Sequence, residues 1–161
     1  MALQVAEVLG TAGENHATLA AAVELIHASL YLHYHVHEET GGRQGPDAAL
    51  AGLGNAANVL LGDLFYTAAF RAIVDLKDHR IARILSDATT AIAEAEVLDL
   101  QTPACAECDA ARYINNIRGK TGKLFEATAQ CSAILSKADA STEQALAVYG
   151  LHLGTAYYVR Q

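Results

Sequence analysis

The chain has 161 residues, of which 52% are hydrophobic and 18% are charged, and its formal net charge is −7. This composition fits one domain, residues 1–161, with enough apolar side chains to bury a sizeable core. The chain has no basic run to attract nucleic acid and no apolar run near the roughly 20 residues of a membrane span, so we expect a cytoplasmic protein with no nucleic-acid partner and no transmembrane segment.

Two stretches carry the spacing of a helix start. Thr11 and Glu14, and again Ser141 and Gln144, stand three residues apart in the order of a capping box. In that pattern a side chain and the backbone satisfy hydrogen-bond donors that the first helical turn leaves free. We therefore predict that helices begin near both positions.

Apolar residues elsewhere recur at helical rather than alternating spacing. Residues 16–39, 48–76 and 79–100 each show this period, and TGGRQGPD at 40–47 is the loop between the first two segments. The second segment is rich in small residues, which let neighbouring helices approach closely. The sequence therefore predicts an all-α fold, a bundle of five or six helices.

The first long segment ends in LYLHYHVHEET, a run of three alternating histidines and two glutamates. On a helix, His33 and His37 share one flank, while His35, Glu38 and Glu39 lie on another, so the three imidazoles cannot converge on one ion. Two narrower zinc or other transition-metal sites stay open, namely His33 with His37, or His35 with a glutamate. The alternative is a set of partly solvated histidines.

Each of these pairs supplies only two metal ligands, so a metal site would need donors from other helices. Further candidates of the right chemistry are Glu24, His27, Glu94 and Glu96.

Cysteine usage adds one weak motif, the lone C-x-x-C of Cys105 and Cys108. A structural zinc site needs four ligands, and no second C-x-x-C stands near this one. We interpret the pair as two thiols in a connecting loop.

Several further blocks follow one another in a recognisable order: ELIHASLYLH, GNAANVLLGDLFYTAAF, AIAEAEVL, GKTGKLFEATAQCSAIL and YGLHLGTAYYV. Together they resemble the trans-isoprenyl diphosphate synthases, above all the octaprenyl and polyprenyl diphosphate synthases. The resemblance runs from about residue 21 to the end. It implies an isoprenoid-synthase helical bundle, usually a homodimer, that elongates an allylic diphosphate with isopentenyl diphosphate.

In that family Mg²⁺ is held by two aspartate-rich D-D-x-x-D motifs. The first falls on positions 34, 35 and 38, where this chain has Tyr34, His35 and Glu38. A phenol and an imidazole are poor Mg²⁺ ligands. The second motif falls around Gln161, where the sequence ends. The resemblance therefore implies a shortened synthase scaffold in which catalysis is impaired.

Other positions match the family's substrate contacts. By resemblance, His27 helps to hold isopentenyl diphosphate, and Lys120 and Thr121 contact the allylic diphosphate. Arg43 matches the first of the family's paired diphosphate-binding arginines, and Gln44 replaces the second. For each of these residues a purely structural role is the alternative.

Two other function classes stay open. One is a metal-binding bundle built on the histidine run. The other is a non-catalytic interaction protein that dimerises through residues 55–70, which in the family lie at the dimer interface.

Overall fold

The computed structural model of the chain describes residues 1–36, 54–101 and 110–159. Most of these residues are helical, and no strand occurs among them, which confirms the all-α prediction. The helices are α1 (Ala2–Val8), α2 (Glu14–Tyr34), α4 (Gly54–Asp75), α5 (His79–Gln101), α6 (Ala110–Ile117), α7 (Lys123–Leu135) and α8 (Ala140–Val159), with a π-helical segment η1 (Arg118–Gly122) between α6 and α7.

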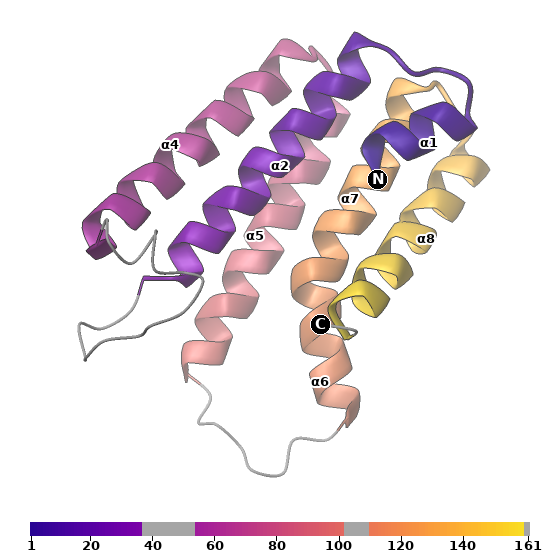
Figure 1. The fold of residues 1–161 in the computed structure, drawn as a ribbon. Helices are drawn as coiled ribbons and strands as arrows, with labels where there is room; N and C mark the ends of the chain where they lie inside the picture. The colour runs from indigo at the N-terminus through magenta and orange to yellow at the C-terminus, as the bar shows by residue number, and fades with distance from the viewer. Residues whose placement is uncertain (37–53, 102–109, 160–161) are drawn as a thin grey trace.

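The long helices run side by side as a bundle (Figure 1). α4 packs mainly on α2, α7 packs mainly on α8, and α5 lies against α7. α6, η1 and α7 follow one another along a single rod, and the short α1 contacts α2 and α7. When α6, η1 and α7 are counted as one continuous helix, the helices of the described ranges agree in number with the five or six predicted.

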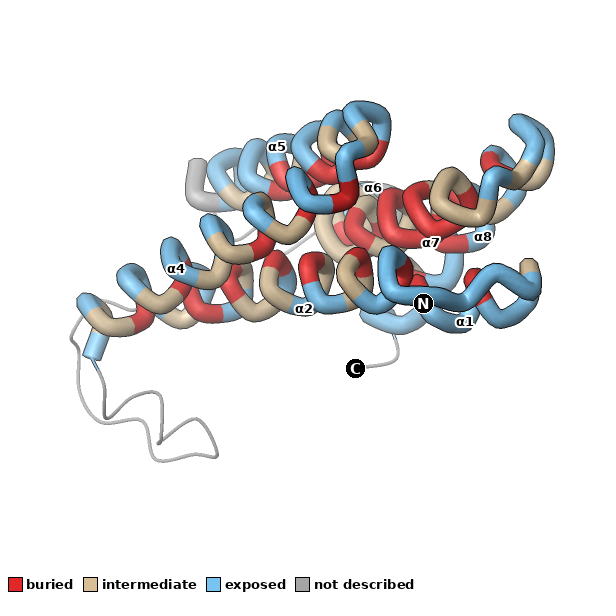
Figure 2. Tube along the Cα trace, turned by 90° about the horizontal axis from the view of Figure 1, so that it is seen from above, coloured by how far each residue is buried: buried red, intermediate tan, exposed pale blue. Residues whose placement is uncertain are grey.

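Buried residues lie along the inner faces of these helices (Figure 2). The largest fully buried ones are Leu19, Ile26, Ile73, Ile81, Leu85 and Cys131. Burial in this apolar core raises the pKa of the Cys131 thiol to about 12, so the thiol stays protonated at neutral pH.

The two predicted capping boxes are wrong, although helices do begin near both. α2 begins at Glu14 after Gly13, and the hydroxyl of Thr11 instead shares a 2.6 Å hydrogen bond with that of Ser136. α8 begins one residue before Ser141, and its cap is Asp139, whose carboxylate accepts a 2.7 Å hydrogen bond from the Thr142 backbone. Asp139 thus takes the expected place of Ser141, whereas the N-cap of α2, Gly13, makes no side-chain cap hydrogen bond.

The long segments match the structure to different degrees. α5 begins at His79, as predicted, and α4 ends at Asp75. The first segment was predicted to reach residue 39, but α2 ends at Tyr34. The backbone N–H of Val36 donates to the carbonyl of His33, at 3.3 Å, and this three-residue hydrogen bond tightens the last turn and ends the α-helix.

Two glycines bring α7 and α8 into close contact. A Cβ at Gly150 would lie 2.5 Å from the carbonyl oxygen of Phe125, and one at Gly154 would lie 2.7 Å from the Phe125 Cβ. Such distances leave no room for any side chain, so the helix pair depends on glycine at these positions.

We expect Gly150→Ala to lower the free energy of unfolding by about 1–3 kcal/mol, because the atom in the way is backbone and cannot rotate aside. Urea unfolding followed by circular dichroism measures this. Gly119→Ala is the matched control, because its Cβ would meet only the Ala95 Cβ at 4.0 Å. An unchanged midpoint for Gly150→Ala would contradict the close packing.

Candidate functional site

One end of the bundle gathers most of the described candidate residues. The C-terminal ends of α2, α5 and α8 lie there together with η1 (Figure 1), and η1 contacts both α5 and α8. We call this region the bundle mouth.

Lys120 and Thr121 lie in η1 at the bundle mouth. A π-helical turn is wider than an α-helical one and is frequent at functional sites. Gly122, the last residue of η1, is buried against α8, where a Cβ would lie 3.1 Å from both Leu151 and Thr155. Because Gly122 has no side chain, η1 packs directly on α8. This contact determines the position of the backbone from which the Lys120 side chain extends.

Lys120 is held by two carboxylates of α5. Its Nζ donates to Asp99 Oδ2 at 2.6 Å and lies 2.8 Å from Glu96 Oε2. Asn116 in turn donates to both carboxylate oxygens of Asp99, at 3.0 Å each. Partial burial lowers the pKa of Lys120, but the hydrogen bonds to Asp99 and Glu96 outweigh it, so the pKa is raised and the amine is charged.

The side of α2 that carries His27 is exposed. His27, Tyr31 and Tyr34 follow one another at helical i, i+4, i+7 spacing, so they share one face. Tyr34 is 68% exposed and Tyr31 is 40% exposed. His27 therefore lies on the same face of α2 as two aromatic rings, two turns before the position of the family's first aspartate.

His33 serves as a contact between α2 and α4. Its ring lies over Gly62, where a Cβ would be 2.6 Å from His33 Cδ2, and its Nε2 lies 3.2 Å from Asp63 Oδ1. The small residue at 62 and the acid at 63 are visible in the sequence, but only the antiparallel pairing of α2 and α4 shows that they meet His33.

His35 lies just beyond the last residue of α2. Its Nδ1–H donates to the backbone carbonyl of Tyr31 at 2.7 Å, and the two rings lie with their centroids 3.9 Å apart. The imidazole thus takes part in closing the helix end, an arrangement that the sequence pattern did not reveal.

These positions do not support the predicted metal sites. Among the residues that the structure describes, no group of three or more His, Cys, Asp or Glu side chains could hold an ion. Glu96, one of the carboxylates considered as a donor, is paired with Lys120. Glu24, His27 and Glu94 lie in the described helices, whereas His37, Glu38, Glu39 and Arg43, and the C-x-x-C of Cys105 and Cys108, lie outside the described residues.

The described positions also do not fit the family's first Mg²⁺ cluster. Mg²⁺ takes hard oxygen ligands in a near-octahedral arrangement. At position 34 the chain offers an exposed phenol, and at position 35 an imidazole whose Nδ1–H is given to Tyr31. Neither group is the carboxylate that the motif requires.

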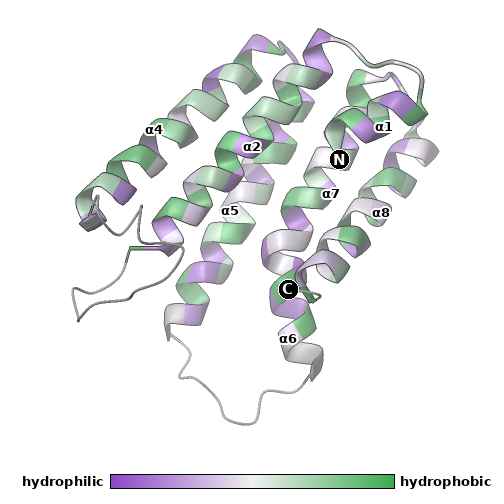
Figure 3. Ribbon diagram, in the orientation of Figure 1, coloured by the Kyte–Doolittle hydropathy of each residue, from purple (hydrophilic) through white to green (hydrophobic). Residues whose placement is uncertain are grey.

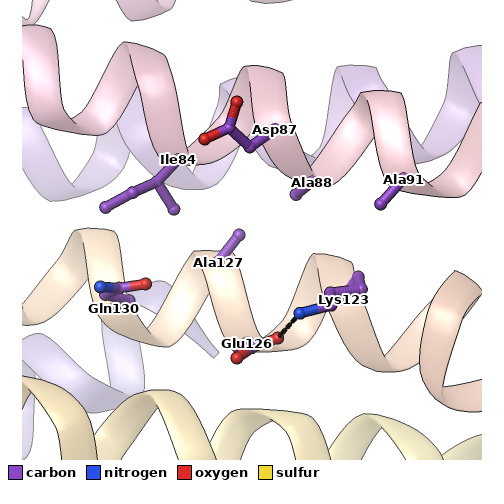
Figure 4. Close-up of a pocket in the computed structure, with 8 residues that line it drawn as sticks. All are labelled: Ile84, Asp87, Ala88, Ala91, Lys123, Glu126, Ala127 and Gln130. Atoms are coloured by element: carbon purple, nitrogen blue, oxygen red, sulfur yellow. Dashed lines mark hydrogen bonds and ion pairs between the residues drawn. The ribbon is translucent and has the colours of Figure 1, made fainter.

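Two grooves flank α5. The groove between α5 and α7, of about 220 Å³, is lined by Asp87, Lys123, Glu126 and Gln130 together with small apolar side chains, and it contains the Lys123–Glu126 ion pair (Figure 4). The groove between α4 and α5, of about 620 Å³, is more apolar, with Tyr66, Val97 and Leu98 in its walls.

α4 is the more apolar of the two long helices that border this second groove (Figure 3). Leu60, Leu64 and Val74 point away from the core and are 58–68% exposed. By length and composition, α4 is also the one helix in the described ranges that could cross a membrane, although 22% of that stretch is buried inside the bundle.

Comparison with known proteins found one matching family and several similar synthases. The polyprenyl synthetase family matches residues 1–161. The chain is 40% identical over 157 residues to octaprenyl diphosphate synthase of Escherichia coli, in an alignment that covers 98% of this chain and 49% of that protein. It is 41% identical over 157 residues to the Haemophilus influenzae octaprenyl diphosphate synthase, covering 98% of this chain and 48% of the relative.

Solved structures agree with this fold. A decaprenyl diphosphate synthase from Rhodobacter capsulatus superposes with a TM-score of 0.84 and 34% identity, over 98% of this chain and 49% of that one. A polyprenyl synthase from Caulobacter crescentus complexed with calcium and isoprenyl diphosphate superposes with a TM-score of 0.82 and 35% identity, over 93% of this chain and 46% of that one. The chain thus spans about half the length of the curated relatives it matches.

The contact of His33 with Gly62 gives a double-mutant test. We expect Gly62→Ala to cost about 0.5–1 kcal/mol of stability, because its Cβ would enter the space of the His33 ring and this partly exposed ring must turn aside. In a His33→Ala background the same change should cost nothing or stabilise slightly, because alanine favours a helix over glycine. Urea denaturation of the four proteins measures the coupling.

Asp63→Asn is the control for this cycle. It removes the ion pair and leaves the packing in place, and because both partners are solvent-exposed it should cost at most about 1 kcal/mol. Equal costs of Gly62→Ala in the two backgrounds would show that His33 does not occupy the space beside Gly62.

Proposed function

Because the chain belongs to the polyprenyl synthetase family, we propose that it is a trans-polyprenyl diphosphate synthase-like protein that binds an isoprenoid diphosphate at the bundle mouth. We further propose that its chain-elongation activity is greatly reduced. Its assignment to a single domain and to the cytoplasm stays a prediction from the sequence.

The η1 turn supports diphosphate binding. Lys120 supplies a charged amine and Thr121 a hydroxyl in neighbouring positions, and both groups bind phosphate oxygens well. The exposed face of α2 with His27, Tyr31 and Tyr34 adds an aromatic surface at the same end of the bundle. A diphosphate head and an apolar tail would each find suitable chemistry in this region.

One observation carries the proposal of reduced activity, namely what stands at the end of α2. Tyr34 and His35 take the positions of two Mg²⁺-binding aspartates, and His35 is hydrogen-bonded to the Tyr31 carbonyl. Without those carboxylates the negative charge of a departing diphosphate loses a main source of stabilisation. The described residues therefore provide no basis for a magnesium-assisted reaction step.

A second proposal concerns the association of two copies of the chain. Leu60, Leu64 and Val74 leave an apolar face of α4 open to solvent. By resemblance to the family this helix lies at the interface of a homodimer. We propose that a second copy of the chain covers the exposed face of α4.

The first test restores the missing carboxylates. We expect the chain, with an allylic diphosphate, isopentenyl diphosphate and Mg²⁺, to elongate at least about 10³-fold more slowly than the E. coli relative assayed beside it. We expect the double variant Tyr34→Asp/His35→Asp to gain a rise in melting temperature with Mg²⁺ plus pyrophosphate that the unaltered chain lacks.

A matched control places the same two substitutions elsewhere. Tyr149→Asp/His152→Asp changes two exposed residues of α8 by the same chemistry and should show no such gain. Rapid elongation by the unaltered chain would contradict the proposed loss of activity.

The second test addresses the dimer. We expect the chain to sediment as a dimer at micromolar concentration, and Leu60→Glu/Leu64→Glu to give a folded monomer, because each carboxylate would have to be buried in the interface. Analytical ultracentrifugation measures both. Val8→Glu, at an 82% exposed position of α1, is the control and should stay dimeric. A monomeric unaltered chain would rule this interface out.

A further inference from the structure

We infer that Asp99 determines how strongly the bundle mouth binds a diphosphate, because it occupies the amine of Lys120 as an internal competitor. The inference rests on the proposed function, in which Lys120 faces the diphosphate. It adds a residue of α5 whose role is to weaken that contact.

The amine of Lys120 is paired with two carboxylates. The amine is 2.6 Å from Asp99 Oδ2 and 2.8 Å from Glu96 Oε2. These two oxygens take two of the three N–H donors that a bound phosphate group could use. An incoming diphosphate therefore competes with them for the amine.

Charge adds to this competition. One lysine and two carboxylates sum to a local charge of −1 where a bare lysine would give +1. A diphosphate carries two or more negative charges, so it meets repulsion at the group that should attract it. The partial exposure of the cluster weakens this repulsion but does not reverse its sign.

Of the two carboxylates, Asp99 is the better anchored. Asn116 donates to both of its oxygens at 3.0 Å, so the carboxylate is held from one side by an amide and from the other by Lys120. For Glu96, the contact within the described part of the chain is the one with Lys120. An incoming anion would displace Glu96 first, and Asp99 would remain as the main competitor.

The test measures binding of inorganic pyrophosphate by isothermal titration calorimetry, without added divalent ions. We expect Asp99→Asn to bind about tenfold more tightly than the unaltered chain, because one nearby negative charge is removed while the side chain keeps its size. We expect Lys120→Gln to weaken binding, and Lys120→Gln combined with Asp99→Asn to lose the gain.

Glu126→Gln is the matched control. It removes one carboxylate charge from α7, where Glu126 pairs with Lys123 at 2.8 Å in the groove between α5 and α7 (Figure 4). Its affinity for pyrophosphate should stay within about twofold of the unaltered chain. Thermal melts of all variants confirm that they fold.

The outcomes separate this inference from the proposed function. If Asp99→Asn binds no more tightly while Lys120→Gln abolishes binding, the competitor role is wrong and the diphosphate site stands. A gain of equal size in Glu126→Gln would assign the effect to overall charge and would also overturn the inference. If no variant binds pyrophosphate, both the inference and the proposed diphosphate site fail.

Discussion

The close approach of α7 and α8 is the constraint on which the bundle mouth depends. Glycines at 150 and 154 let α8 lie directly against the backbone and side chain of Phe125. One turn further along, Gly122 lies against Leu151 and Thr155 in the same way. The rod that carries Lys120 is thus held at a fixed depth on α8, and its amine comes within reach of α5. The salt bridges of Lys120 at the bundle mouth therefore depend on close helix packing at glycines, which have no side chain.

Much of the fold could be predicted from the sequence, because it rests on signals that repeat over many residues. The helical period of α5 and its first residue were correct, and the order of the sequence blocks was enough to indicate the family. Helix ends were harder, because single hydrogen bonds decide them. Thr11 bonds to Ser136, 125 residues away, and a sequence pattern that spans four residues cannot reveal such a partner.

The candidate site was predicted less completely, for a related reason. Lys120 and Thr121 were found because they stand together in a short motif. The role of Lys120 depends on Glu96 and Asp99, which lie more than 20 residues earlier and meet it only because α5 and η1 touch. The seat of His33 on Gly62 has the same origin. Spacing along a single helix could not show which neighbouring helix each histidine would meet.

The position of α4 bears on how the fold would come apart. Most of its contacts are with α2, and few of its residues are buried, Asn58, Gly62, Ala69 and Ile73 among them. A helix fixed mainly on one side has a low free energy of local opening, so its amide protons should exchange with solvent well before those of α7. Cover by a second copy would slow that exchange. The rate of amide hydrogen exchange in α4 would then indicate whether the protein is a monomer or a dimer.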